Sequence, residues 1–405
     1  MTVKVLIVDL GSKFNTVGGQ ARLAAVLSKR LSRYFKTYYL GYRTSYSDGI
    51  RHHIFIERDK KLGLSIRKSG LSEMWGPRFA YNLLVVSRMS DLDKESLLEK
   101  VRDIGPSVII ANSIQDINLL RFFRKRGLNF KAIYIDHGSV STSIRGYFSK
   151  EGIPLTVGTG FDSLSLYRKK TKFFNFYDIT VALNHDQLGR ICDFTDKVAL
   201  IQNGLDIKPA KDRSKAQRIR AAHGIKAKDF VVLYIGRMFD RQKNVSTLIR
   251  AFRGINDSNL KLLLVGDGPS LESYRQLASG DDRIIFWGGA DDKDVGSIYG
   301  MSDLFVLPSF WEGFSLTILE AAAHGLPMIL SSNAYIDDLK GGGMDEISSF
   351  DPNSPDELRN CIVDMYTNRA RRARAIRASV KISRKFTEGM MVEKYRDLIL
   401  KLNRT

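Results

Sequence analysis

Short apolar runs alternate along the chain with longer segments in which apolar residues recur every three or four positions. The runs are typical of buried parallel strands, and the longer segments are typical of helices that cover a sheet. In the first half of the chain the predicted strands are Val3–Leu10, Thr37–Leu40, His53–Glu57, Val108–Ala111, Ala132–Asp136 and Ile179–Leu183. This alternation predicts an α/β domain with a doubly wound sheet.

The same alternation restarts after residue 197, beyond a change in composition that follows Asp193. The strands predicted there are Phe230–Ile235, Leu260–Val265, Arg283–Trp287, Leu304–Leu307 and Pro327–Leu330. Before them, the basic stretch Lys208–Lys228 is typical of a connector with a surface helix. At 405 residues the chain can hold two domains, since one domain usually has roughly 100 to 200 residues. We therefore expect one doubly wound domain over residues 1–197 and another from residue 198.

The stretch from Pro308 to Pro327 predicts a strand end, a turn and a helix. The inward-facing residues of this helix are predicted to be Leu316, Leu319, Ala322 and Ala323. Backbone N–H groups of its first turn, around Phe314–Thr317, and the helix dipole favour an anion. Glu312 and Glu320, eight residues apart, would suit paired hydroxyls if both faced one cleft. By itself this spacing is more often a pair of solvent-facing charges, so the surrounding residues have to decide.

Two further loops of the second domain carry candidate groups. Gly236 and Arg237 follow its first strand, and Lys243 comes six residues after the arginine. An arginine fork and a lysine point charge at a strand's carboxyl edge suit a diphosphate. The turn Gly266-Asp267-Gly268-Pro269 follows the second strand, where it would flank a nucleotide base. The alternatives are solvated surface charges and a simple Gly-Pro turn.

Two features of the first domain also follow predicted strands, where open α/β sheets bind their ligands. Gly18 and Gly19 precede a helix and would either let the backbone approach a phosphate or form a tight turn. Their loop lacks the G-x-G-x-x-G spacing, so a nicotinamide cofactor is not indicated. His137 follows the strand Ala132–Asp136 and is either a ligand-contacting residue or a histidine that is hydrogen-bonded for structural reasons.

The net charge of +19 is concentrated in the first half of the chain, where residues 1–200 hold 32 Lys/Arg and 18 Asp/Glu, a net of +14. Such a field favours anionic partners. In Arg121–Arg126 and Arg168–Phe174 basic residues alternate with aromatics, which is typical of a surface that touches anionic lipid or of a solvated helix face. No nucleic-acid-binding module is recognisable, so we expect no nucleic acid partner. Arg369–Arg377 is predicted to be a solvated helix face.

No apolar run reaches the roughly 20 residues that span a bilayer, and the chain opens on a strand rather than on a signal peptide. Cys192 and Cys361 are far apart and lack metal-ligand spacing, which suits a reducing compartment. Both thiols are predicted to be inert. These features predict a cytoplasmic protein.

Assembled, the motifs resemble those of the retaining GT-B-fold nucleotide-sugar glycosyltransferases, the large group 1 family (family 4) with a Glu-x7-Glu motif. The resemblance rests on Asn203-Gly204-Leu205-Asp206, the Gly-Arg and Lys loop, Gly266-Asp267-Gly268-Pro269 and, above all, Pro308-Ser309 through Glu320-Ala321. It implies two Rossmann-like domains facing across a cleft. Residues 1–197 would form the acceptor side and 198–385 the donor-binding domain, and 386–405 would be a helix that returns to the first domain.

The resemblance also implies roles at matching positions. Arg237 and Lys243 would neutralise the leaving diphosphate, Glu312 would contact the sugar, and His137 would contact its far side; these four are the expected catalytic residues. Glu320 would hold the ribose hydroxyls. The other donor-binding positions that it implies are Gly18, Gly19, Gly236, Gly266, Gly313, Phe314, Ser315 and Leu316.

Enzymes of this kind work without a metal, so we expect neither a metal site nor a cofactor, and we interpret Asp91-Leu92-Asp93 as a helix cap. The expected partners are a nucleotide diphosphate sugar, a glycan or lipid-linked acceptor, and an anionic membrane surface on which a cytoplasmic enzyme would be peripheral. The alternatives are an epimerase or a phosphorylase on the same fold, or a non-catalytic sugar-nucleotide-binding partner.

Three departures from the family pattern leave the sugar-side contacts open. Ser315 and Asn244 stand where glycine is frequent. After Leu330, the segment Ser331–Asp338 replaces the usual Gly-Gly and Glu pattern.

Overall fold

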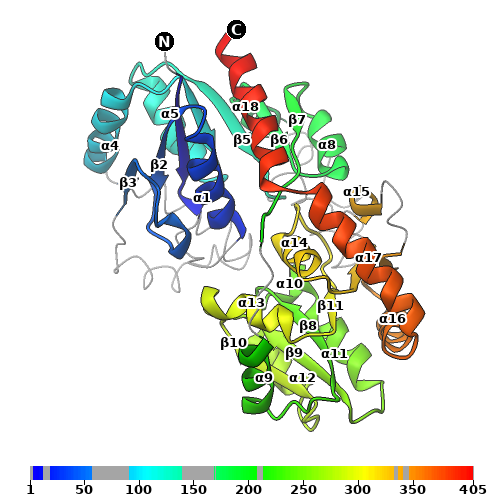
Figure 1. Ribbon diagram of the computed structural model, residues 1–405. Coiled ribbons are helices and arrows are strands. Elements are labelled where there is room, and N and C mark those ends of the chain that lie inside the picture. Colours follow the sequence, from blue (N-terminus) through cyan, green and yellow to red (C-terminus); the bar gives the residue numbers. More distant parts are fainter. Residues whose placement is uncertain are drawn as a thin grey trace. The chain divides into compact units, whose positions relative to one another are not determined.

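The computed structural model describes residues 3–11, 19–56, 91–138, 168, 170–207, 213–332, 336–340 and 346–404. The chain forms two compact units, each built on a parallel sheet (Figure 1). The first unit comprises Met1–Leu183, Gln187–Ile201 and Val392–Thr405, and the second comprises Asn184–Asp186 and Gln202–Met391. The predicted α/β class with two doubly wound sheets is confirmed.

The first sheet has the strand order β3-β2-β1-β4-β5-β6-β7, and its strands pair in parallel. Its strands are β1 (Lys4–Asp9), β2 (Lys36–Gly41), β3 (His53–Phe55), β4 (Val108–Ala111), β5 (Lys131–Ile135), β6 (Ile179–Ala182) and β7 (Val198–Leu200). The helices described between them are α1 (Gly19–Leu31), the short 3-10 helix η2 (Ser45–Ser47), α4 (Asp91–Ile104), α5 (Asp116–Lys125) and α8 (His185–Cys192). Chain order reverses between β1 and β4, which is the topological switch point of this sheet.

The second sheet has the order β10-β9-β8-β11-β12-β13 and is also parallel. Its strands are β8 (Phe230–Ile235), β9 (Leu260–Val265), β10 (Ile284–Gly288), β11 (Leu304–Leu307), β12 (Met328–Ser331) and β13 (Ser348–Phe350). The helices are α9 (Arg213–Ala222), α10 (Asp240–Lys243), α11 (Val245–Arg253), α12 (Leu271–Leu277), α13 (Asp292–Gly300), α14 (Leu316–Ala323), α15 (Ile336–Lys340), α16 (Pro355–Thr367) and α17 (Arg369–Lys385). Here the switch point lies between β8 and β11. The last helix, α18 (Glu388–Arg404), belongs to the first unit from Val392 onward.

The predicted strands are all present, with ends that differ by one or two residues; Glu57, the predicted end of one, lies outside the described residues. Two differences matter. Strand β7 pairs with β6, so the first unit extends to Ile201 instead of ending at residue 197. Strand β13 was not predicted, because Ser348 and Ser349 interrupt the apolar signal at the edge of the sheet.

Helix α14 is buried on more sides than its periodicity predicted. Ile318 and Ala321 are buried along with Leu316, Leu319 and Ala322, whereas Ala323 is only half-buried. A helix that is apolar all round belongs inside a domain. Its amino-terminal end is therefore held in a fixed position against the sheet.

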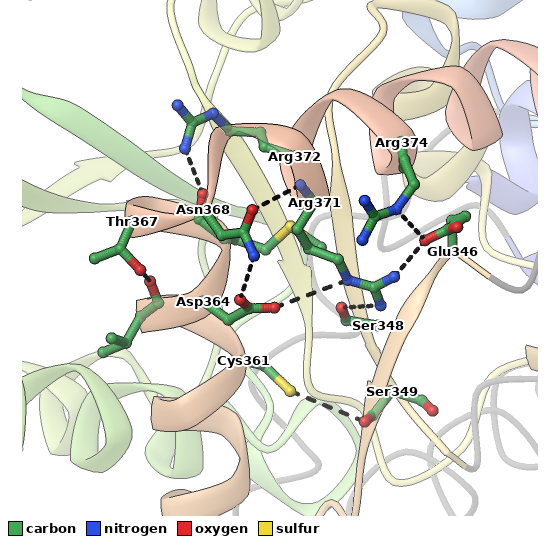
Figure 2. Close-up of polar contacts among 12 residues, drawn as sticks. Glu346, Ser348, Ser349, Cys361, Asp364, Thr367, Asn368, Arg371, Arg372 and Arg374 are labelled. Atoms are coloured by element: carbon green, nitrogen blue, oxygen red, sulfur yellow. Dashed lines mark hydrogen bonds and ion pairs between the residues drawn. The ribbon is translucent and has the colours of Figure 1, made fainter.

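The arginine-rich helix α17 is more than a solvated face (Figure 2). Arg371 pairs with Glu346 and, at 3.8 Å, with Asp364, and its guanidinium also donates to Ser348 of β13. Arg372 donates at 2.6 Å to the Met365 carbonyl near the end of α16. These contacts attach the arginine-rich helix to the sheet edge and to the preceding helix, which corrects the sequence-based interpretation.

The basic and aromatic residues of α5, and the arginine that follows this helix, contact other segments of the first unit. The Arg124 guanidinium lies 4.5 Å from the centroid of the Phe176 ring and donates to Asp178 at 3.1 Å. Arg126 pairs with Glu95 and stacks on Phe122. The alternation of charge and aromatic rings is thus explained by intramolecular cation–π packing. Within the described residues, no helix is long and apolar enough to cross a bilayer.

Candidate functional site

The loops after β8 and β11 meet at the switch point of the second sheet, where open α/β sheets bind ligands. Lys243 ends helix α10 in the first loop, and Glu312 lies in the second. Their Nζ and Oε1 atoms are 2.5 Å apart, and the two side chains are 17% and 7% exposed. Ser309 donates to the same carboxylate oxygen at 2.6 Å. Glu312 is therefore held by two partners and in turn fixes the lysine ammonium at the sheet edge.

Asn244 follows Lys243 at a position where glycine is frequent in the family, and its backbone and contacts show why asparagine fits there. Its φ is 53°, in the left-handed region where glycine is usual and asparagine is the best tolerated of the other residues. Its side-chain amide donates to the carbonyls of Pro308, at 3.1 Å, and Pro352, at 2.7 Å. This asparagine thus ties the lysine loop to the start of the glutamate loop, which a glycine could not do.

The Asn244 contacts predict an order of stabilities. Asn244→Ala loses both amide donors but keeps a Cβ in left-handed backbone, which costs about 1–2 kcal/mol, whereas Asn244→Gly loses the donors and the Cβ together. We expect the thermal midpoint to fall from wild type to Asn244→Gly to Asn244→Ala, measured by scanning calorimetry. Equal midpoints for the two variants would contradict the role of the left-handed backbone.

Glu320 lies on α14, about one helical turn after its first residue, and is 7% exposed. The hydroxyl of Tyr299, on α13, donates to its Oε2 at 2.7 Å. The ring of His324 stacks on Tyr299, with centroids 5.1 Å apart, and its Nδ1 bonds the Glu320 carbonyl at 2.8 Å. The carboxylate is thus oriented through one oxygen by a buried phenol.

Two asparagines orient the backbone that leads into α14. Asn184 donates to the Gly313 carbonyl at 2.5 Å, and Asn203 donates to the Phe314 carbonyl at 2.8 Å. In a trans peptide the carbonyl and the next N–H point in opposite directions. The asparagines therefore also fix the direction of the N–H groups of Phe314 and Ser315. Ser315 has an ordinary φ of −68°, so its position does not require glycine.

Ser315 is the N-cap of α14, and Leu316 is its first residue. The Ser315 hydroxyl lies 2.8 Å from the Thr317 hydroxyl. A helix begins here with its first-turn N–H groups and positive dipole end, which favour an anion. The predicted donor-binding stretch Gly313–Leu316 thus lies on the same loop as Glu312.

Glycines permit close backbone contact at the carboxyl ends of β8 and β9. A Cβ built on Gly266 would lie 1.8 Å from the Gly236 carbonyl oxygen, and one built on Gly236 would lie 3.0 Å from the Tyr234 hydroxyl. That hydroxyl donates at 2.8 Å to the carbonyl of Arg237, which is half-buried. The glycine positions are needed for packing, and they place Arg237 at the same sheet edge as Lys243.

Gly204 of the Asn-Gly turn is needed for the same reason. A Cβ there would lie 1.9 Å from the Thr387 carbonyl oxygen. Leu205 N donates to the Phe386 carbonyl at 3.0 Å. The turn therefore anchors the chain just before α18, and its asparagine is held beside α14.

The first unit gathers a separate set of polar groups at its own switch point. Gly19 is exposed and begins α1, whereas Gly18 lies outside the described residues. His137 follows β5, is half-buried, and has its Nε2 3.0 Å from Asn112 Oδ1. Burial lowers the pKa of His137 to about 4, so the ring is neutral near pH 7. Asn112 follows β4, which pairs with both β1 and β5.

In the second unit the structure joins Lys243 to Glu312, and in the first unit Asn112 contacts both His137 and Gln20, the residue after Gly19. Sequence reasoning missed Tyr299, Asn184 and Asn112. Asn112 carried a usable signal, because it directly follows a buried strand that neighbours the central one. Tyr299 and Asn184 carried none, since their partners are 21 and 129 residues away.

Residues 229–368 match the family model described as Glycosyl transferases group 1. The matched range contains the second-unit motif residues from Gly236 to Glu320, whereas the turn Asn203–Asp206 precedes it.

The chain is also similar in sequence or in fold to several known proteins. Over 277 residues the chain is 29% identical to the UDP-Gal:alpha-D-GlcNAc-diphosphoundecaprenol alpha-1,3-galactosyltransferase of Escherichia coli, covering 62% of this chain and 70% of that protein. Over 159 residues it is 31% identical to N-acetyl-alpha-D-glucosaminyl L-malate synthase of Bacillus anthracis, covering 38% of this chain and 41% of that protein. The crystal structure of Anabaena Alr3699/HepE in complex with UDP and glucose matches with a TM-score of 0.72 and 16% identity, covering 98% of this chain and 99% of that one. This last likeness shows that the fold is GT-B.

Proposed function

We propose, from the premise that residues 229–368 belong to the group 1 glycosyl transferases, that the chain is a retaining hexosyltransferase. It would move a hexose from a nucleotide diphosphate sugar to a lipid-linked or glycan acceptor. The observation that carries the proposal is the Lys243–Glu312 pair at the β8/β11 switch point, with Glu320 on the helix that follows. A cation, an oriented helix terminus and a buried carboxylate suit a diphosphate that is joined to a ribose.

The named relatives support the two substrate classes. The E. coli relative is named for a UDP-sugar and a diphosphoundecaprenol acceptor, and the Anabaena structure holds UDP and glucose. By similarity, we assign a nucleotide diphosphate sugar as donor and a lipid-linked or glycan molecule as acceptor for this chain.

In the proposed reaction, the acceptor hydroxyl oxygen bonds to the anomeric carbon as the bond from that carbon to the β-phosphate oxygen breaks. The hydroxyl proton passes to the departing phosphate oxygen, so attack on the face that the diphosphate leaves retains the anomeric configuration. Negative charge grows on the diphosphate during this step. Lys243, Arg237 and the amino-terminal end of α14 would stabilise that charge from preorganised positions. Glu320 would hold the ribose, and His137 and Glu312 would contact the sugar.

The donor is the first thing to test. A thermal-shift series with UDP-, GDP- and ADP-sugars should raise the midpoint for one nucleotide class, because a ligand that binds only the folded state stabilises it. The donor so identified is then incubated with and without acceptor and phosphate. Net transfer only with an acceptor supports the proposal. Epimerisation of the free donor, a requirement for phosphate, or binding without turnover would each contradict it.

We also propose that transfer needs no metal, because Lys243, Arg237 and the helix dipole supply the positive charge at the diphosphate. Transfer rates should be unchanged after dialysis against a chelator and unchanged when Mg²⁺ or Mn²⁺ is added back. A rate that falls in chelator and recovers with either ion would contradict this part of the proposal.

A further inference from the structure

Asn112 occupies the carboxyl edge of the first sheet between the start of α1 and His137. It is fully buried, and its Nδ2 donates to the Gln20 carbonyl at 3.0 Å. In return, Gln20 Nε2 donates to the Asn112 carbonyl at 2.5 Å. A carbonyl oxygen only accepts hydrogen bonds, so the contact with Gln20 settles which end of the Asn112 amide is the nitrogen.

The orientation of this amide determines the protonation of the histidine. With Nδ2 directed at Gln20, the atom that lies 3.0 Å from His137 Nε2 is Oδ1, which can only accept. Nε2 must therefore carry the proton. In a neutral imidazole the other nitrogen, Nδ1, then has a lone pair and acts as an acceptor. Among the residues that the structure describes, none donates a hydrogen bond to Nδ1.

The other titratable groups at this edge are held by partners of their own. Asp116 accepts from Leu10 N at 3.0 Å and from Ser113 N at 2.8 Å, and burial raises its pKa. Asp136 accepts from Gly138 N at 3.2 Å and also interacts with Lys170, which is buried. Asp9, at the end of β1, is buried and raises the pKa of Asp116 further. The pKa of His137 is lowered by burial, so the ring keeps its lone pair near neutral pH.

We propose that Asn112 is a positioning residue that locks His137 in the Nε2–H tautomer, so that Nδ1 accepts a hydrogen bond from a hydroxyl of the transferred sugar. The role of the sugar rests on the proposed function, whereas the tautomer does not. Because Asn112 also bonds Gln20, it sets the histidine relative to the start of α1, where Gly19 lies. The residue would therefore position both of the predicted contacts of the first unit.

The tautomer is tested without any substrate by ¹⁵N NMR of ring-labelled histidines. His137 is assigned by its loss in His137→Gln, and we expect a proton-bearing Nε2 and a pyridine-like Nδ1. His53, whose Nδ1 lies 3.2 Å from the Ile50 carbonyl, is an internal control with the opposite tautomer. Asn112→Leu removes the acceptor, so the His137 signals should shift to a mixture of tautomers while those of His53 stay. A proton on Nδ1 in wild type, or an unchanged ring in Asn112→Leu, would overturn the assignment.

A second variant covers the case in which Asn112→Leu does not fold. Asn112→Asp keeps an acceptor next to Nε2 but makes it an anion, which raises the pKa of His137. Above that raised pKa the neutral ring should still carry its proton on Nε2, because the introduced carboxylate can only accept. A neutral ring with its proton on Nδ1 in Asn112→Asp would overturn the assignment.

The contact with the sugar is tested by comparing two ligands. In Asn112→Leu only part of the His137 rings can accept at Nδ1, so binding of the nucleotide sugar should weaken by up to about tenfold, with the bare nucleoside diphosphate unaffected. Equal losses for both ligands would show a general structural effect and overturn the sugar contact. If no nucleotide sugar binds wild type, the proposed function fails, and the NMR result still decides the tautomer.

Discussion

Replacing Lys243 with alanine is expected to lower the rate of sugar transfer by roughly 100- to 1000-fold, the usual effect of removing one preorganised charge-stabilising donor. The ammonium is held 2.5 Å from Glu312, so it is already in place when charge develops on the diphosphate. The loss should appear mainly in kcat, because the charge on the leaving group increases in the transition state. Steady-state transfer with the donor found in the thermal-shift series measures it.

Two controls separate chemistry from folding. Lys243→Ala leaves the buried Glu312 carboxylate without its cation, which can cost about 3–5 kcal/mol of stability. The double variant Lys243→Met with Glu312→Gln removes both charges and should recover the thermal midpoint but not the rate. Lys215→Ala breaks an ion pair of 2.9 Å with Asp294, elsewhere in the same unit, and should leave the rate unchanged. A double variant as active as wild type would contradict the proposed role of the lysine.

The fold was predictable because parallel strands are buried on both faces and so stand out as apolar runs. Strands β4, β8, β9 and β11 have the predicted bounds. Strand β13 was missed because an edge strand of three residues with two serines has no such run. The boundary at residue 197 missed by four residues because Val198–Leu200 pairs back onto β6, and a change in composition does not reveal pairing.

The sequence supplied candidate residues but did not predict which of them pair within the site. Glu312 and Glu320 come from one stretch, and its spacing was visible. The partners that orient them come from elsewhere: Lys243 is 69 residues from Glu312, and Tyr299 is 21 residues from Glu320. Lys243 and Glu312 meet because the sheet order places β8 beside β11. A local sequence pattern does not show which strands are neighbours in a sheet.

Asn244 replaces the glycine that is frequent in the family and still adopts the backbone conformation for which glycine is favoured. Glycine suits a left-handed residue because it has no Cβ. Asparagine tolerates the same backbone and adds amide donors, which here reach Pro308 and Pro352. From the sequence the departure suggested uncertain contacts. In the structure it is an anchor between the two loops that carry Lys243 and Glu312.

Glu320→Ala is expected to weaken donor binding by roughly 10- to 150-fold, since a hydrogen bond to a charged group contributes about 1.5–3 kcal/mol. The carboxylate is 7% exposed and held through Oε2 by Tyr299. Tyr299→Phe keeps the carboxylate but removes that restraint, so its affinity should lie between those of wild type and Glu320→Ala. Isothermal calorimetry with the nucleoside diphosphate measures all three.

The ligand itself can identify the group that Glu320 binds. If Glu320 accepts from the ribose, a dideoxyribose nucleotide should bind wild type more weakly than the ribose form, and this difference should vanish in Glu320→Ala. A persistent difference would place the ribose elsewhere. Tyr366→Phe removes a comparable tyrosine–carboxylate bond, 3.1 Å to Asp257, and should leave affinity unchanged. Because the ligand comparison changes only the ribose hydroxyls and the tyrosine control only one phenol hydroxyl, they test the ribose contact separately from the charge of the diphosphate, which Lys243 and Arg237 would meet.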